Sequence, residues 1–120
     1  MLTDDEMQYK IDYEIIVDAY DEYEQSMGWF YFFEETLEFP FTATAQLKRR
    51  DGTTESKRVK LTGLVSKEED FRDNDFNLEM EQGQYVRPIA YSALSDIRAS
   101  DETLEAFEIW DFAWRGRKGE

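Results

Sequence analysis

The sequence contains neither cysteine nor histidine among its 120 residues. Without cysteine there can be no disulfide bond and no thiolate metal site. Without histidine the chain lacks the commonest general base, the Ser-His and Cys-His dyads, and the usual zinc ligands. A nucleophilic enzyme would have to use lysine, tyrosine or carboxylate groups instead. We therefore expect a binding protein rather than an enzyme.

Basic residues are also scarce, with 14 Lys and Arg against 28 Asp and Glu and a net charge of −14. Binding to a phosphate backbone needs clustered Lys and Arg, and anionic membranes repel such a chain. No apolar run approaches the roughly 18 residues of a membrane span. The acidic N-terminus lacks the basic and apolar regions of a signal peptide. We expect a soluble cytoplasmic protein that binds neither nucleic acid nor membranes.

Oxygen is the main ligand atom that remains, in carboxylate, amide and hydroxyl groups, and it suits hard cations such as Ca²⁺ and Mg²⁺. Residues 1–40 hold twelve acidic residues and one basic residue, Lys10, for a net charge of −11. These acids flank an aromatic run at residues 29–33. Asp21 and Glu24 fit an N-cap and its third helical residue, which is a structural role.

Five other acids of this region point to a cation. Glu34, Glu35 and Glu38 are expected in the last turns of a helix, where the dipole is negative and exposed carboxylates cost about 0.3–1 kcal/mol each. Glu14 and Asp18 are expected four residues apart on one helix face, where like charges repel. A bound cation would relieve both effects. The alternative is a solvated acidic surface.

The hydrophobic pattern predicts an α+β fold: two N-terminal helices, a small antiparallel sheet or SH3-like barrel, and a C-terminal helix. We expect a single domain over residues 1–120. Its parts would be a flexible end at 1–8, an acidic helical part at 9–38, a β part at 39–98 and a C-terminal helix at 100–114. The elements expected within these parts are helices at about 9–20 and 22–37, strands at about 41–47, 59–63, 76–80 and 85–89, and a 3₁₀ turn at 91–94.

The same pattern predicts which side chains are buried. In the first helix we expect two adjoining apolar stripes in the core, formed by Ile11, Ile15 and Ala19 and by Tyr9, Tyr13, Ile16 and Tyr20. In the last helix the expected apolar face is Leu104, Phe107, Trp110 (or Asp111) and Trp114, with Glu102, Glu105, Glu108 and Asp111 expected to be exposed. Gly28 costs up to about 1 kcal/mol inside a helix, which indicates close packing against another element.

Residues 66–77 form an acidic loop that offers a second cation site. Residues 73–77 resemble the opening of an EF-hand loop, but Leu78 stands where the turn needs glycine and Gln84 where the closing glutamate belongs. No EF-hand is therefore expected. A solvated loop is the alternative to a site. The acids that could contribute are Glu68, Glu69, Asp70, Asp73 and Asp75.

Residues 41–63 carry six basic and two acidic residues. A patch of this size without interleaved aromatic residues is a small footprint for nucleic acid, and we interpret it as a solvated hairpin that offsets the acidic helices.

Several segments resemble the small cyanobacterial-type calcium-binding proteins (CcbP-like), in order along nearly the whole chain. The longest are EIIVDAY (14–20) and GWFYFFEETLEFPFTA (28–43). Shorter matches are VKLTGL (59–64), KEED (67–70), RPIAYSAL (87–94) and DETLEA (101–106). The resemblance implies a protein that binds Ca²⁺ through acidic side chains and has no EF-hand.

Together these observations predict a cytosolic Ca²⁺ buffer or sensor. The first ligands we expect are Asp18 and Glu35, with Glu14, Glu34 and Glu38 behind them. The alternative is a protein-interaction module that presents its acidic helices to a basic partner, without metal. A hydrolase with paired carboxylates is the weakest reading, because the sequence indicates neither a pocket nor a raised pKa.

Overall fold

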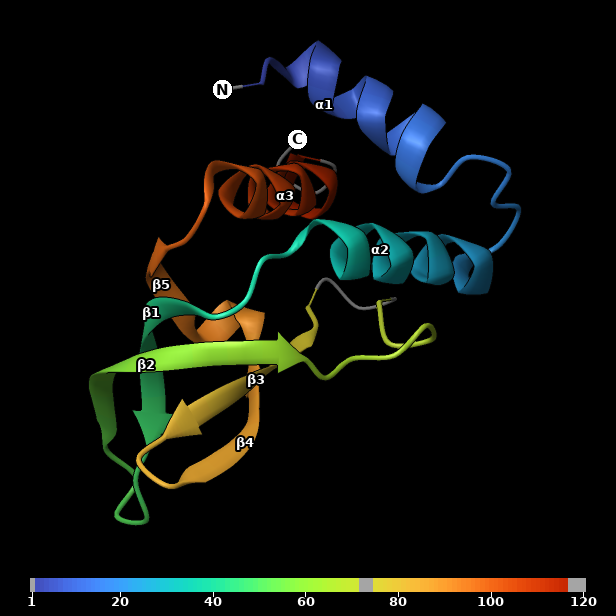
Figure 1. Ribbon diagram of the computed structural model, residues 1–120. Helices are drawn as coiled ribbons and strands as arrows, with labels where there is room; N and C mark the ends of the chain where they lie inside the picture. Colours follow the sequence, from blue (N-terminus) through green and yellow to red (C-terminus); the bar gives the residue numbers. More distant parts are fainter. Residues whose placement is uncertain (1, 72–74, 117–120) are drawn as a thin grey trace.

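The computed structural model of the protein describes residues 2–71 and 75–116, and it has the α+β architecture that the sequence predicts. Figure 1 shows the helices grouped at one end of the molecule and the sheet at the other. None of the described helices is long and apolar enough to cross a membrane. The elements are α1 (Asp4–Lys10), a π-helical segment (Ile11–Ile15), α2 (Glu22–Thr36), β1 (Phe41–Lys48), β2 (Thr54–Leu64), β3 (Asn77–Gln82), β4 (Tyr85–Ala90), a 3₁₀ turn (Tyr91–Ala93), β5 (Leu94–Arg98), α3 (Asp101–Asp111) and a second π-helical segment (Phe112–Gly116).

The sheet has five antiparallel strands in the order β4-β3-β2-β1-β5. The two outer strands, β4 and β5, are not paired with each other in the part of the chain that the structure describes. The sheet is therefore open and is not the closed SH3-like barrel that was the other form of the prediction. The β1–β2 hairpin turns at Asp51 and Gly52, and Gly52 has a φ of +90°, which suits glycine.

An aromatic cluster joins the helices to the sheet. Phe33 of α2 is fully buried. Its ring centroid lies 4.8 Å from that of Phe76, 5.6 Å from Phe71 and 5.8 Å from Trp110 on α3. Trp29 and Trp110 meet edge to face at 5.0 Å. The aromatic run near the middle of α2 thus supplies the centre of the core, which large rings stabilise strongly.

The first helix begins earlier than predicted, at Asp4. A capping box explains this start, because the Thr3 backbone N–H donates to Glu6 Oε1 (3.0 Å) and the Glu6 N–H donates to Thr3 Oγ1 (3.1 Å). Residues 4–8, which were expected in a flexible end, are therefore helical.

The helical path also ends earlier than predicted, in a π turn at Ile15. The Ile16 N–H donates to the Ile11 carbonyl oxygen (2.9 Å), five residues back, and Ile11 and Ile15 are buried as predicted. The tyrosine stripe is not buried: Tyr9, Tyr13 and Tyr20 are 59%, 64% and 86% exposed. The expectation that these tyrosines belong to the core is wrong, because the face formed by Met7, Ile11 and Ile15 is the one buried against the rest of the protein, and of the predicted stripe Ile16 is partly buried.

Side-chain hydrogen bonds cap the start of α2 and join its C-terminal end to the start of α3. Asp21 caps α2 by accepting from the Glu24 N–H (2.8 Å), as predicted. After the helix ends, the Glu38 N–H donates to the buried Thr103 Oγ1 (2.9 Å). Ser100 caps α3 and also contacts Thr103. This arrangement fixes the first turn of α3 beside the last turn of α2.

The buried face of α3 differs from the predicted one. Thr103, Ala106 and Ile109 are buried together with the predicted Phe107 and Trp110. Leu104 is 39% exposed, since it lies on the side of the helix away from the core. Of the acids that were expected to be exposed, Glu105, Glu108 and Asp111 are half-buried, and Asp111 accepts a hydrogen bond from the Tyr91 hydroxyl.

Candidate cation site

Four carboxylates line an open groove of about 550 Å³ between the first π-helical segment, α2 and α3. Glu14 comes from the π-helical segment, Glu35 from the last turn of α2, and Glu102 and Glu105 from the first turns of α3. Acids from three separate elements therefore face one space. The other lining residues are Lys10, Ile15, Gly28, Tyr31, Phe32, Thr36, Ala106 and Ile109.

Gly28 determines how closely two sides of this groove approach. A Cβ atom at Gly28 would collide with the carbonyl oxygen of Ile15, so only glycine allows this contact between α2 and the π-helical segment. The close packing that the sequence indicated is confirmed. It places Glu14 on the same groove as Glu35.

The electrostatics of the groove are dominated by negative charge. Glu35 lies near the C-terminal end of α2, where the helix dipole opposes a carboxylate. Lys10 also lines the groove, and its Nζ lies 3.8 Å from Glu14 Oε1. This pair is partly exposed, with 33% of the Lys10 side chain and 54% of the Glu14 side chain accessible, so it offsets little of the repulsion.

The donor atoms fit Ca²⁺, whereas their present positions do not yet form a coordination shell. Carboxylate oxygens and the Thr36 hydroxyl are the hard ligands that Ca²⁺ prefers. Among the described residues, no group of three or more acidic side chains is placed to hold a metal ion. Glu14, Glu35 and Glu102 are exposed, so their side chains are free to turn.

Two of the five predicted ligands, Glu14 and Glu35, thus meet in the groove, and three lie outside its lining. Asp18 is in a bend with φ +60°, and because the helix ends at Ile15 it does not share a helix face with Glu14. Glu34 is exposed on α2, and Glu38 lies beyond the helix end rather than in its last turn.

Sequence reasoning missed Glu102 and Glu105. Their spacing on α3 is that of an ordinary solvated face, and only tertiary packing brings them to Glu14 and Glu35. The one signal in the sequence is the family-like segment at 101–106, which contains both residues.

The acidic loop forms a smaller hollow of about 350 Å³, lined by Ser66, Asp70, Asp75, Phe76 and Asn77. Its two carboxylates already have structural partners. Asp75 accepts from the Ser92 N–H (3.0 Å) and hydroxyl (2.6 Å), and Asp70 accepts from the Lys67 N–H (2.7 Å).

The remaining acids proposed for this second site do not strengthen it. Glu68 and Glu69 do not line the hollow, and Asp73 lies outside the described residues. A second cation site therefore stays a prediction, supported by Asp70 and Asp75 alone.

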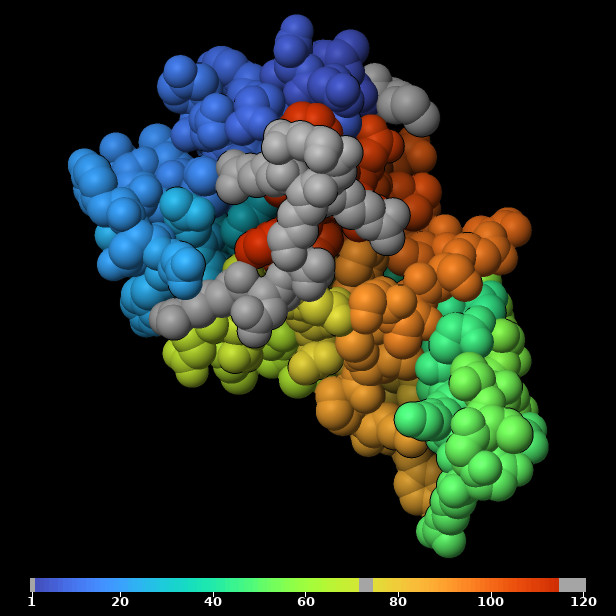
Figure 2. All heavy atoms as spheres, turned by 180° about the vertical axis from the view of Figure 1, so that it is seen from behind, coloured from blue at the N-terminus to red at the C-terminus, as the bar shows by residue number. Residues whose placement is uncertain are grey.

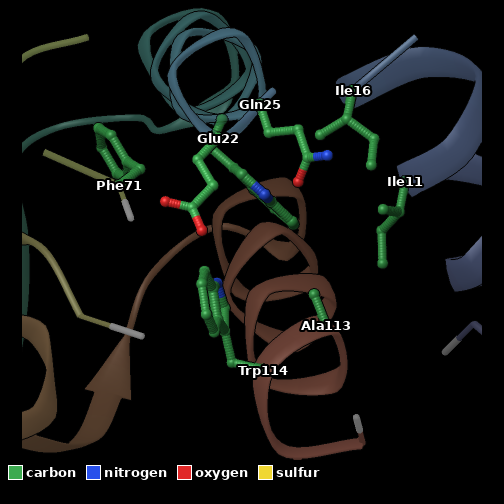
Figure 3. Close-up of a pocket in the computed structure, with 8 residues that line it drawn as sticks. Ile11, Ile16, Glu22, Gln25, Phe71, Ala113 and Trp114 are labelled. Atoms are coloured by element: carbon green, nitrogen blue, oxygen red, sulfur yellow. The ribbon is translucent and has the colours of Figure 1, made fainter. Parts of the chain in front are cut away.

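A third hollow, of about 240 Å³, lies between the first π-helical segment, α2, Phe71 and the second π-helical segment, and it has mainly apolar walls. Figure 3 shows Glu22 and Gln25 extending from α2 into the space above Trp114. One carboxylate and one amide are too few for a Ca²⁺ shell of six to eight oxygens. The interhelical groove is the better cation site.

The basic hairpin is far from this groove. Figure 2 shows the N-terminal helical part and the β1–β2 hairpin at opposite ends of the molecule, and Figure 1 agrees. The positive charge of residues 41–63 therefore does not neutralise the groove locally. Among the described side chains that line the groove, Lys10 is the basic one.

Comparisons with known proteins point to the same ligand. A family profile described as calcium binding, Calci_bind_CcbP, matches residues 9–115. The structure is similar to the crystal structure of Anabaena CcbP, with 34% sequence identity, a TM-score of 0.78, and coverage of 97% of this chain and 95% of the other. It is also similar to a structure described as a calcium binding protein in the calcium-binding form, with 30% identity, a TM-score of 0.73 and coverage of 98% of each chain. None of the curated proteins compared matches the chain.

The family profile and both structures extend over almost the entire chain, including every element that lines the groove. The similarity therefore covers the acidic helices together with the sheet, and is not confined to a common fold motif. The chain belongs to the CcbP family of calcium-binding proteins.

Proposed function

We propose that the protein binds Ca²⁺ in the interhelical groove and acts in the cytosol as a calcium buffer or sensor without enzymatic activity. Calcium binding itself rests on family membership. The observation that carries the location is that Glu14 and Glu35 meet Glu102 and Glu105 in one groove.

The chemistry of these side chains supports the proposal. Four carboxylates that face one space repel one another, and a divalent cation removes this repulsion. Ca²⁺ accepts six to eight oxygens in flexible geometry, so carboxylates, the Thr36 hydroxyl and water can complete a shell after the side chains turn inward. Asp18, Glu34 and Glu38 would act from outside the groove lining, and their role as ligands stays a prediction.

The test compares two adjacent glutamates by calorimetric titration of chelator-treated protein with Ca²⁺. We expect Glu35→Gln to weaken Ca²⁺ binding roughly tenfold or more, because the number of charged ligands tunes affinity. Glu34→Gln is the matched comparison, and it also tests the predicted role of Glu34 as a ligand. It removes the same charge from the neighbouring position, which does not line the groove.

Each outcome has a definite meaning. Equal losses in the two variants would place the site elsewhere, while calcium binding would stand. A wild-type protein that binds Ca²⁺ no better than Mg²⁺, with small effects from both, would indicate screening of an acidic surface and overturn the proposal.

A second candidate function is the recognition of a basic protein partner. The specific observation is the exposure of Tyr9, Tyr13 and Tyr20 along a helical part rich in acids. Tyrosine and carboxylate side chains together favour arginine, through cation–π contacts and charged hydrogen bonds. The failure of calcium binding in the titration above would favour this function.

A further inference from the structure

We propose that Lys10 is a built-in counter-ion that competes with Ca²⁺ for the interhelical groove and thereby lowers the affinity of the site. This inference rests on the proposed function and adds to it a residue that sets affinity without being a ligand.

The position of Lys10 in the fold carries the first step. Its side chain lines the carboxylate groove, and its Nζ is 3.8 Å from Glu14 Oε1. The ammonium group thus lies beside one of the four carboxylates that line the groove. A ligand role for Glu14 requires that this pair be broken.

The pair is also easily broken. Lysine stands four residues before glutamate, which is the less favourable order on a helix, and both side chains are partly exposed. Salt bridges of this kind contribute little to stability. Ca²⁺, with two charges and many oxygen ligands, can therefore displace the ammonium group.

A second position is available to the displaced side chain. Lys10 also lines a neighbouring hollow of about 350 Å³, together with Leu2, Asp5, Glu6, Tyr9 and Glu14. Asp5 and Glu6 there can accept the ammonium group when Ca²⁺ occupies the groove. The side chain therefore lies between two spaces that both contain carboxylates.

The sequence shows how unusual this charge is. Lys10 is the first basic residue, and the next one along the chain is Lys48. Lys10 is thus the one basic residue among the twelve acids of residues 1–40. It lies in the lining of a groove that four carboxylates also line. Its expected effect on Ca²⁺ affinity, from the repulsion of charges several ångströms apart in screened solvent, is roughly three- to tenfold.

The experiment compares Lys10→Gln with Lys57→Gln. Both substitutions remove one positive charge, but Lys57 is an exposed residue of β2 outside the groove lining. Ca²⁺ affinity is measured by calorimetry, and the unfolding midpoint is measured with chelator and with saturating Ca²⁺. Lys10→Arg keeps the charge and should restore wild-type affinity.

We expect Lys10→Gln to bind Ca²⁺ roughly three- to tenfold more tightly than Lys57→Gln. In chelator its unfolding midpoint should stay close to that of wild type, because the Lys10–Glu14 pair is partly exposed and contributes little to stability, whereas the increase produced by Ca²⁺ should be larger.

Three results would overturn the inference. These are equal affinities for the two glutamine variants, weaker binding by Lys10→Gln, or no restoration by Lys10→Arg. In each case wild-type Ca²⁺ binding would leave the proposed function in place. The absence of Ca²⁺ binding in wild type and in both glutamine variants would overturn the proposed function and, with it, this inference.

Discussion

Gly28 shows how one residue controls the geometry of the groove. It is in the middle of α2, where alanine would favour the helix by about 1 kcal/mol. The carbonyl oxygen of Ile15 occupies the space that a Cβ atom would need. Helix propensity and tertiary packing therefore oppose each other at this position, and packing has the larger effect.

We predict that Gly28→Ala lowers the free energy of unfolding by about 1–3 kcal/mol, because backbone atoms must shift to admit the methyl group. Urea denaturation measures this change. Gly63→Ala is the control, since a Cβ there would contact Glu79 at an ordinary 3.8 Å. A Gly28→Ala variant as stable as wild type would show that the π-helical segment does not need this close approach.

The residues of the candidate site could be predicted only in part from sequence. Glu14 and Glu35 were expected from local charge repulsion, a property visible within one segment. Glu102 and Glu105 were not, because their contribution depends on the packing of α3 against α2. Asp18 was assigned to a helix face that the chain leaves at Ile15, so the spacing argument does not apply to it.

At the level of secondary structure, the start of α1 depends on reciprocal hydrogen bonds between Thr3 and Glu6. The hydrogen bonds from Thr3 lower the pKa of the Glu6 carboxyl group below its usual 4.5. A lowered pKa in the folded state means that the ionised form is the one the fold stabilises. The contribution of Glu6 is therefore present above about pH 4.5 and is lost as the pH falls through the lowered pKa.

We predict that the Thr3 amide resonance shifts on acidification with a midpoint below 4.5, as measured by a nuclear magnetic resonance titration. Glu6→Gln is the control, because glutamine can form the same capping box without titrating. Its Thr3 amide should lack this transition. A midpoint at 4.5 or above in wild type would contradict a charge-stabilised cap.

Elements with a strong local pattern were predicted well. The alternation of Phe41, Ala43, Ala45 and Leu47 identified β1, and the Asp51-Gly52 turn identified its hairpin with β2. The Thr3 to Glu6 capping signature was present in the sequence but was not used. Strand β5 was missed, because its five residues show no alternating burial and its pairing with β1 contains a register shift.

At the scale of the whole molecule, negative charge is concentrated in the N-terminal helices and positive charge in the β1–β2 hairpin. Figure 2 shows these two parts of the chain at opposite ends of the molecule. The α+β class was predictable, because helical and alternating periods occupy separate parts of the chain. The open form of the sheet was not, since closure depends on whether β4 meets β5, two strands that lie close together in sequence but at opposite edges.

We predict that Ca²⁺ slows amide hydrogen exchange most strongly in residues 11–15 and in the first turn of α3. An ion held by side chains from both elements would restrain their separation. The sheet hairpin should change least, and Glu35→Gln protein under the same conditions should show a much smaller effect. An equal gain of protection in the hairpin would contradict binding in the groove.

The π turn at Ile11–Ile15 has an evolutionary consequence. Each residue of a helix adds about 100° of rotation, so deleting one residue within this turn would turn α1, which carries Lys10, by about that angle relative to the groove while leaving Lys10 and Glu14 in the sequence. The Ca²⁺ affinity of the groove can therefore change through an insertion or deletion in this turn as well as through a substitution. Related chains that conserve every acid of the groove but differ in the length of this turn would then respond to calcium over different concentration ranges.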